Sequence, residues 1–106
     1  MSKSTEKQLL VDKIVEAIQD TKGEDIQIFD LSGIENSVAD TFVICSGNSN
    51  TQVSAIAGNI EKKVRNDIRE RPWHVEGTEN AMWVLVDYVS VVVHVFQKQI
   101  RDYYDI

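Results

Sequence analysis

The spacing of apolar residues predicts two amphipathic helices. The first is expected over residues 6–20, with Thr5 as a candidate cap, because apolar side chains recur there every three or four positions. The second is expected to begin at Ser49 or Asn50 and to extend to about Glu70, with Pro72 as the residue that ends it. The apolar positions of the two helices are Leu10, Ile14, Ala17, Ile18, Val53, Ile56, Ala57, Ile60, Val64 and Ile68.

Short apolar or alternating runs between turn residues predict five β-strands. The strands are expected over residues 26–31, 41–46, 73–76, 82–88 and 90–96. The third of these alternates only briefly, whereas the second is apolar on both sides, which is typical of a strand buried on both faces. The last two strands are separated by almost no chain and should form an antiparallel hairpin. A short helix or turn is expected over residues 99–104.

The order of these elements favours an α/β fold. Helix, strand, strand, helix, three strands and a final helix predict a mixed β-sheet with helices packed on it. The chain has 106 residues, of which 42% are hydrophobic and 26% are charged, and this composition fits one domain over residues 1–106. We find no internal repeat and no linker in the sequence.

Composition and charge disfavour three classes of protein: nucleic-acid binders, membrane proteins and secreted proteins. The net charge is −6, which opposes the counterion release that drives most nucleic-acid binding, so we expect little direct binding of RNA or DNA. An acidic domain is better suited to a basic protein partner. The longest apolar runs are far shorter than the roughly 20 residues that cross a bilayer, and the first residues lack a secretory signal. We therefore expect a cytoplasmic protein with no membrane partner.

The titratable residues do not follow the spacing of a metal site or of a nucleophilic site. Cys45, His74 and His94 are scattered, without a CxxC or HExxH pair. His94 lies in an apolar strand, where a hydrogen-bonded structural histidine is the default. Cys45 lies in an apolar run and is expected to pack as a small hydrophobic residue. We expect no metal and no cofactor.

Residues 47–50 form a strand-to-helix junction that suggests an alternative function. Backbone amides at the start of a helix can hold a phosphate, and junctions of this type occur in nucleotidyltransferases that bind magnesium with paired carboxylates. Asp87 is the nearest candidate carboxylate, and no second acid stands two residues away. A nucleotide-binding or nucleotidyl-transfer enzyme is therefore the alternative prediction, and a two-metal site is disfavoured.

Aromatic residues near the hairpin and the C-terminus are candidates for a protein interface. They are Trp83, Tyr88, Phe96, Tyr103 and Tyr104, with Arg101 among them. Aromatic residues and arginine dominate interface hot spots. The same residues could equally be cross-strand pairs or core residues. The alternation of the strand places Trp83 on the face of Leu85 and Asp87, opposite Val84 and Val86.

Several ordered motifs in the chain resemble one known family. They are DTFVICSGNSNTQV at 40–53, AIA at 55–57, EG at 76–77, AMWVLVDY at 81–88, VVVHVF at 91–96 and RDYY at 101–104. Together they are similar to the ribosomal silencing factor family, also called iojap-related. The chain departs from the family at Val89-Ser90, where Gly-Asp is common, so this turn lacks the residue that most easily takes a positive φ.

The resemblance implies a translational repressor and not an enzyme. It implies a nucleotidyltransferase-like core without catalytic carboxylates, which binds the large ribosomal subunit through ribosomal large-subunit protein fourteen and sterically blocks joining of the small subunit. By similarity, Trp83, Tyr88, Arg101 and Tyr104 are the expected partner contacts. Asp40, Asp87 and His94 match family motif positions whose roles stay unassigned. A homodimer of the free protein is left open.

Overall fold

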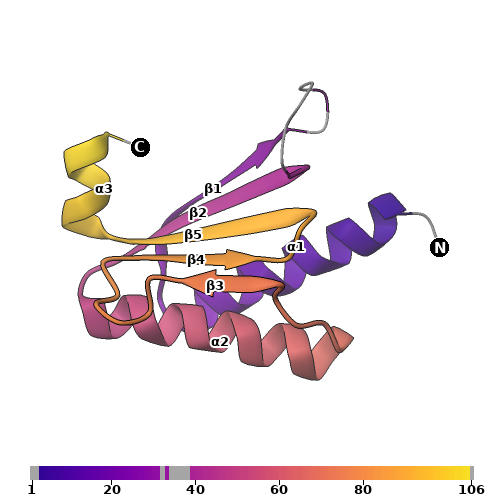
Figure 1. The fold of residues 1–106 in the computed structure, drawn as a ribbon, viewed down its shortest axis with the longest axis horizontal. Coiled ribbons are helices and arrows are strands. Elements are labelled where there is room, and N and C mark those ends of the chain that lie inside the picture. The colour runs from indigo at the N-terminus through magenta and orange to yellow at the C-terminus, as the bar shows by residue number, and fades with distance from the viewer. Residues whose placement is uncertain (1–2, 32, 34–38, 106) are drawn as a thin grey trace.

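A computed structural model describes residues 3–31, 33 and 39–105 of the chain (Figure 1). Its elements are α1 (Lys3–Asp20), β1 (Glu24–Asp30), β2 (Thr41–Gly47), α2 (Asn50–Ile68), β3 (His74–Glu76), β4 (Trp83–Asp87), β5 (Val91–Gln97) and α3 (Lys98–Tyr104). The mixed α/β class and the type and order of these elements confirm the prediction from the pattern. The likeness to a nucleotidyltransferase core stays a prediction.

The five strands form one mixed sheet in the order β1-β2-β5-β4-β3. Strand β5 is the central strand and runs parallel to β2, whereas the other neighbouring pairs of described strands are antiparallel. The predicted hairpin of β4 and β5 is confirmed, with Val84 opposite Val95 and Val86 opposite Val93. Because β5 pairs with β2, the C-terminal hairpin is inserted beside a strand that lies about fifty residues earlier in the chain.

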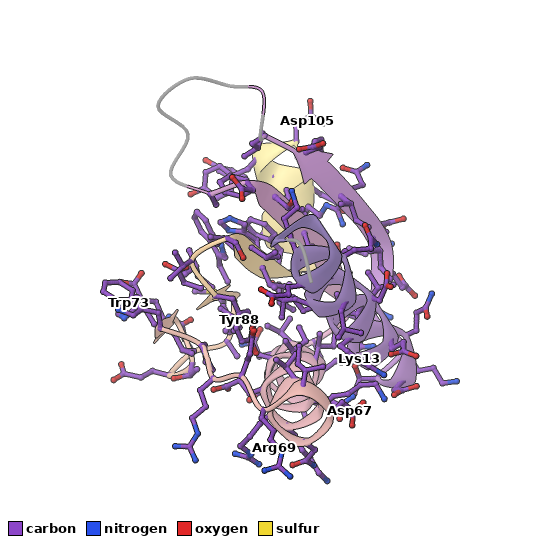
Figure 2. The ribbon with its side chains drawn as sticks, turned by 90° about the vertical axis from the view of Figure 1, so that its right-hand side faces the viewer. Lys13, Asp67, Arg69, Trp73, Tyr88 and Asp105 are labelled. Carbon is purple, nitrogen blue, oxygen red and sulfur yellow. The ribbon has the colours of Figure 1, made fainter. Side chains whose placement is uncertain are left out.

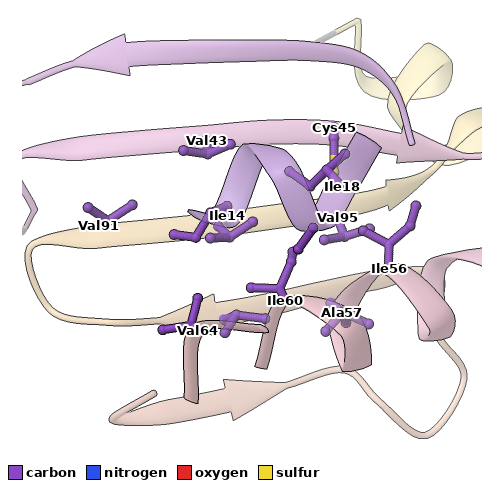
Figure 3. Packing of buried hydrophobic residues seen from close by; sticks show 14 of the residues in the cluster. Ile14, Ile18, Val43, Cys45, Ile56, Ala57, Ile60, Val64, Val91 and Val95 are labelled. Carbon is purple, nitrogen blue, oxygen red and sulfur yellow. The ribbon is translucent and has the colours of Figure 1, made fainter. Parts of the chain in front are cut away.

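Helices α1 and α2 cover one face of this sheet and enclose the core. Figure 3 shows Ile14 and Ile18 of α1 and Ile56, Ile60 and Val64 of α2 against the strands. The sheet contributes a valine-rich layer to this core: Val43, Val84, Val86, Val91, Val93 and Val95, all fully buried. Since side chains of a strand alternate between its faces, the residues between these valines lie on the opposite face of the sheet.

The ends of the two long helices differ in part from the sequence prediction. Ser49 is the N-cap of α2, as expected, and its hydroxyl oxygen accepts a hydrogen bond from the Gln52 N–H at 3.1 Å. The other end is set by Arg69, which adopts the left-handed conformation and donates its N–H to the Arg65 carbonyl. Pro72 therefore lies beyond a helix that has already ended. Thr5 lies inside α1 and does not cap it.

The turn between β4 and β5 is unusually tight. The Ser90 N–H donates to the Tyr88 carbonyl at 2.9 Å, which closes a three-residue turn around Val89. Val89 has a φ of 75°, a conformation that costs a β-branched residue free energy. At the position where the family commonly has glycine, this chain thus has a valine with a positive φ.

Candidate functional site

The face of the sheet opposite the helices is lined by aromatic and apolar side chains. We call this surface the aromatic face and define it by six residues: Phe42, Ile44, Trp83, Leu85, His94 and Phe96. Of these, Ile44 and Phe96 are buried, Phe42, Leu85 and His94 are half-buried, and Trp83 is exposed. Strand register brings them together, because Trp83 lies opposite Phe96, and His94 lies between Leu85 and Ile44. Trp83 is 46% exposed. The prediction that Trp83 shares a face with Leu85 and Asp87 is confirmed.

Trp83 is held in a defined position on the aromatic face. Its ring stacks on Phe96 with a centroid distance of 4.9 Å, and its indole N–H donates to His94 Nδ1 at 3.2 Å. Gly77 lies against the Trp83 backbone, and glycine is required there because its φ is 86° and a Cβ would collide with the Trp83 carbonyl. About half of the indole therefore stays accessible while its orientation is fixed by contacts on two sides.

His94 is the polar centre of the aromatic face. Because Nδ1 accepts from Trp83, the neutral ring carries its proton on Nε2. Nε2 is buried, and no hydrogen-bond partner for it lies among the described residues. Phe42 packs edge-on against the imidazole at 5.1 Å. Burial lowers the pKa of His94 from its ordinary value of 6.5, so this side chain acts as a neutral hydrogen-bond acceptor and orients Trp83.

Two of the four residues expected to contact a partner are buried, which is the alternative that the sequence left open for them. Tyr88 is 7% exposed, and burial raises the pKa of its phenol. Arg101 is 5% exposed and donates from one nitrogen to the Asp25 carbonyl and to the Ser46 hydroxyl, both at 2.7 Å. Its guanidinium joins α3 to β1 and β2. In this conformation both side chains present little surface to a partner.

The C-terminal tyrosines are exposed, unlike Tyr88. Tyr104 and Tyr103 pack edge to face in α3, with ring centroids 5.1 Å apart. Helix α3 begins directly after β5, and β5 ends beside the start of β4. Helix α3, which carries Tyr104, thus lies at the end of the sheet where β4 begins with Trp83 (Figure 1).

Asp40 and Asp87 both support the turn between β4 and β5. The Asp87 carboxylate accepts the Val89 N–H at 2.7 Å, and this contact helps to hold the positive φ of that residue. The Asp40 N–H donates to the Ser90 carbonyl at 3.0 Å, so the turn is also joined to the start of β2. The contact of Asp87 uses its side chain, whereas that of Asp40 is made by the backbone and does not depend on the aspartate.

The start of α2 offers little to a phosphate. The Asn48 N–H donates to the Gln52 side-chain oxygen at 2.6 Å, and Ser49 occupies the Gln52 N–H. Two backbone amides that could face an anion therefore already have partners. Within the described part of the chain, no three His, Cys, Asp or Glu side chains gather where a metal ion could bind. Burial raises the pKa of the Cys45 thiol to about 12, which makes it unreactive at neutral pH.

The fold defines a small α/β domain that presents an exposed, oriented tryptophan on the sheet face opposite α1 and α2. None of its described helices is long and apolar enough to cross a membrane. The model of the family described as "Ribosomal silencing factor during starvation" matches residues 3–106. The chain belongs to the ribosomal silencing factor family.

Curated relatives agree with this assignment. The chain is 43% identical to the ribosomal silencing factor of Halalkalibacterium halodurans over 99 residues, which cover 93% of this chain and 83% of that protein. It is 47% identical to the ribosomal silencing factor of Bacillus subtilis over 91 residues, which cover 85% of this chain and 75% of that protein. These relatives are named as silencing factors and not as enzymes.

Solved structures share the fold at similar identity. A crystal structure of a Chromobacterium violaceum protein has a TM-score of 0.86 and 38% identity, and covers 92% of this chain and 80% of that chain. A crystal structure from Bacillus halodurans has a TM-score of 0.80 and 43% identity, and covers 92% of this chain and 90% of that one. The same fold thus accompanies the sequence relationship.

Proposed function

We propose that this protein represses translation by binding the large ribosomal subunit and preventing the small subunit from joining. The proposed contact on the ribosome is ribosomal large-subunit protein fourteen. Membership of the ribosomal silencing factor family supports a ribosomal target. The observation that carries the proposal is the half-exposed, oriented indole of Trp83 on the face of the sheet opposite α1 and α2.

The aromatic face has the chemistry of a protein-binding surface. A rigid tryptophan supplies large contact area at low entropic cost, because stacking and a hydrogen bond already restrict its rotation. The net charge of −6 favours approach to a basic partner, as most ribosomal proteins are. We place Tyr104 at the edge of the contact, since it is exposed on α3, which follows β5 at the end of the sheet where β4 begins.

The proposed mechanism is steric and requires no chemical step. A bound domain of this size occupies part of the subunit surface, and the small subunit cannot dock where that surface is covered. Affinity alone then sets the degree of repression, so the protein needs neither a cofactor nor a catalytic residue. In the free protein, a second copy of the chain could use the same face.

Sedimentation with separated ribosomal subunits tests the proposal. We expect the protein to pellet with large subunits and not with small ones. Trp83→Ala should weaken this binding about thirtyfold, since truncating a central interface aromatic typically costs about 2 kcal/mol of binding free energy. Leu9→Ala is the matched control, because Leu9 is 42% exposed but lies on α1.

Folding must be separated from binding in this experiment. Half of the indole is buried, so Trp83→Ala should also lower the free energy of unfolding by about 2 kcal/mol. Circular dichroism at the assay temperature shows whether the Trp83→Ala variant is folded. If that variant is unfolded, Trp83→Phe takes its place in the binding assay, because phenylalanine keeps the stacking on Phe96. Equal binding to both subunits, or full binding by a folded Trp83→Ala variant, would reject the proposal.

A further inference from the structure

A second surface, charged where the aromatic face is apolar, lies where α2 ends and the chain approaches β3. Four residues define what we call the arginine patch: Arg65, Arg69, Arg71 and Trp73. Figure 2 shows Arg69 below the end of α2 and Trp73 projecting from the side of the molecule. The Arg69 N–H donates to the Arg65 carbonyl at 3.0 Å, which fixes the spacing of these two residues.

The arginine patch is exposed and its charge is not neutralised. All three arginines are exposed, and none of them forms an ion pair within the part of the chain that the structure describes. Trp73 is 78% exposed, more than Trp83. The backbone N–H of Trp73 donates to the Asp87 carbonyl at 2.7 Å, so the backbone that carries this indole is anchored to β4.

Two adjoining hollows run through the patch. One, of about 410 Å³, is lined by Asn66 and the three arginines. The other, of about 450 Å³, shares Arg65 and Arg71 with the first and is bordered by Trp73. Three arginines and a tryptophan therefore line two neighbouring hollows that have Arg65 and Arg71 in common.

The neighbouring acids do not cancel this local charge. Asp67 is engaged by Lys13 and Lys63, at 3.3 and 3.7 Å. Glu70 lines a different hollow, together with Tyr88. Among the residues that the structure describes, Glu61 is the single acid lining the two hollows, beside three guanidinium groups without an ion pair. The patch is locally basic although the whole chain carries a charge of −6. The expectation of little direct RNA binding rests on that net charge and does not take this local cluster into account.

We propose that the arginine patch binds single-stranded RNA. Arg65, Arg69 and Arg71 would contact successive backbone phosphates, which the planar guanidinium binds with two hydrogen bonds. The Trp73 indole would stack on one base. The exposed indole favours RNA over an acidic protein segment, because a segment of carboxylates offers no flat ring to stack on it. This inference does not depend on the proposed contact with a ribosomal protein.

Fluorescence anisotropy with a labelled 12-nucleotide RNA of mixed sequence, titrated at several salt concentrations, tests the inference. Three phosphate contacts predict a slope of about −2 for the logarithm of the binding constant against the logarithm of the salt concentration. Arg65→Gln, Arg69→Gln and Arg71→Gln together should bring this slope close to zero. Trp73→Ala should weaken binding roughly tenfold and leave the slope unchanged.

The matched control changes the same charge elsewhere. Lys7→Gln, Lys22→Gln and Lys98→Gln together remove three charges from residues outside the patch, and this variant should bind RNA within about twofold of the parent. Loss of binding equal to that of the arginine variant would overturn the inference, because net charge alone would then explain it. A glutamate peptide of 12 residues that binds as tightly as the RNA, unaffected by Trp73→Ala, would overturn it in favour of an acidic protein partner.

Discussion

Val89 offers a direct test of the backbone geometry next to the aromatic face. Its φ of 75° should cost an L-residue about 1–2 kcal/mol relative to glycine, which adopts this conformation freely. At an ordinary position, glycine is instead less stable than alanine by about 0.5–1 kcal/mol. Because Val89 is 59% exposed, truncating its side chain removes little packing in either case. Val89→Gly should therefore be more stable than Val89→Ala by about 1 kcal/mol.

The comparison of the two variants isolates the strain from the loss of the valine side chain. Thermal unfolding followed by circular dichroism should give Val89→Gly a melting temperature about 4 °C above that of Val89→Ala. Thr78 is the control position, since it lies in an exposed turn without a positive φ, and Thr78→Ala should be more stable than Thr78→Gly. If alanine is also the more stable residue at position 89, the inferred strain is absent and the reasoning fails.

Two further predictions concern buried polar side chains. Burial lowers the pKa of His94, so near pH 6.5 the unfolded chain takes up a proton that the folded chain does not. The free energy of unfolding should therefore fall as the pH drops below 6.5. Urea unfolding measured from pH 7.5 to 5 should show a smaller fall in this free energy for His94→Gln than for the parent. Arg101→Ala removes two hydrogen bonds of a buried cation and should lower the free energy of unfolding, measured by urea unfolding, by about 3 kcal/mol. Lys98→Ala on the same helix should change this free energy by less than about 0.5 kcal/mol. Equal effects of the two substitutions would contradict the inference that Arg101 holds α3 against β1 and β2.

Local periodicity determined much of this protein. The stripe from Leu10 to Ile18 and the longer stripe in α2 specify helices with one buried face, and the alternation in β4 assigns Trp83 and Val84 to opposite faces of the sheet. These properties depend only on neighbouring residues in the chain, so they can be deduced without knowing what packs against them. The family motifs likewise depend on sequence alone.

Only the tertiary structure decided which strands are neighbours and which polar residues are buried. Trp83, His94 and Ile44 share one surface because β5 pairs with both β4 and β2. The burial of Arg101 depends on a carbonyl and a hydroxyl that lie 76 and 55 residues away along the chain. Residue type does not reveal such partners, because the same guanidinium is exposed at Arg69 and enclosed at Arg101. A charged side chain is buried only where the folded chain brings hydrogen-bond acceptors to it, and that depends on contacts between distant segments.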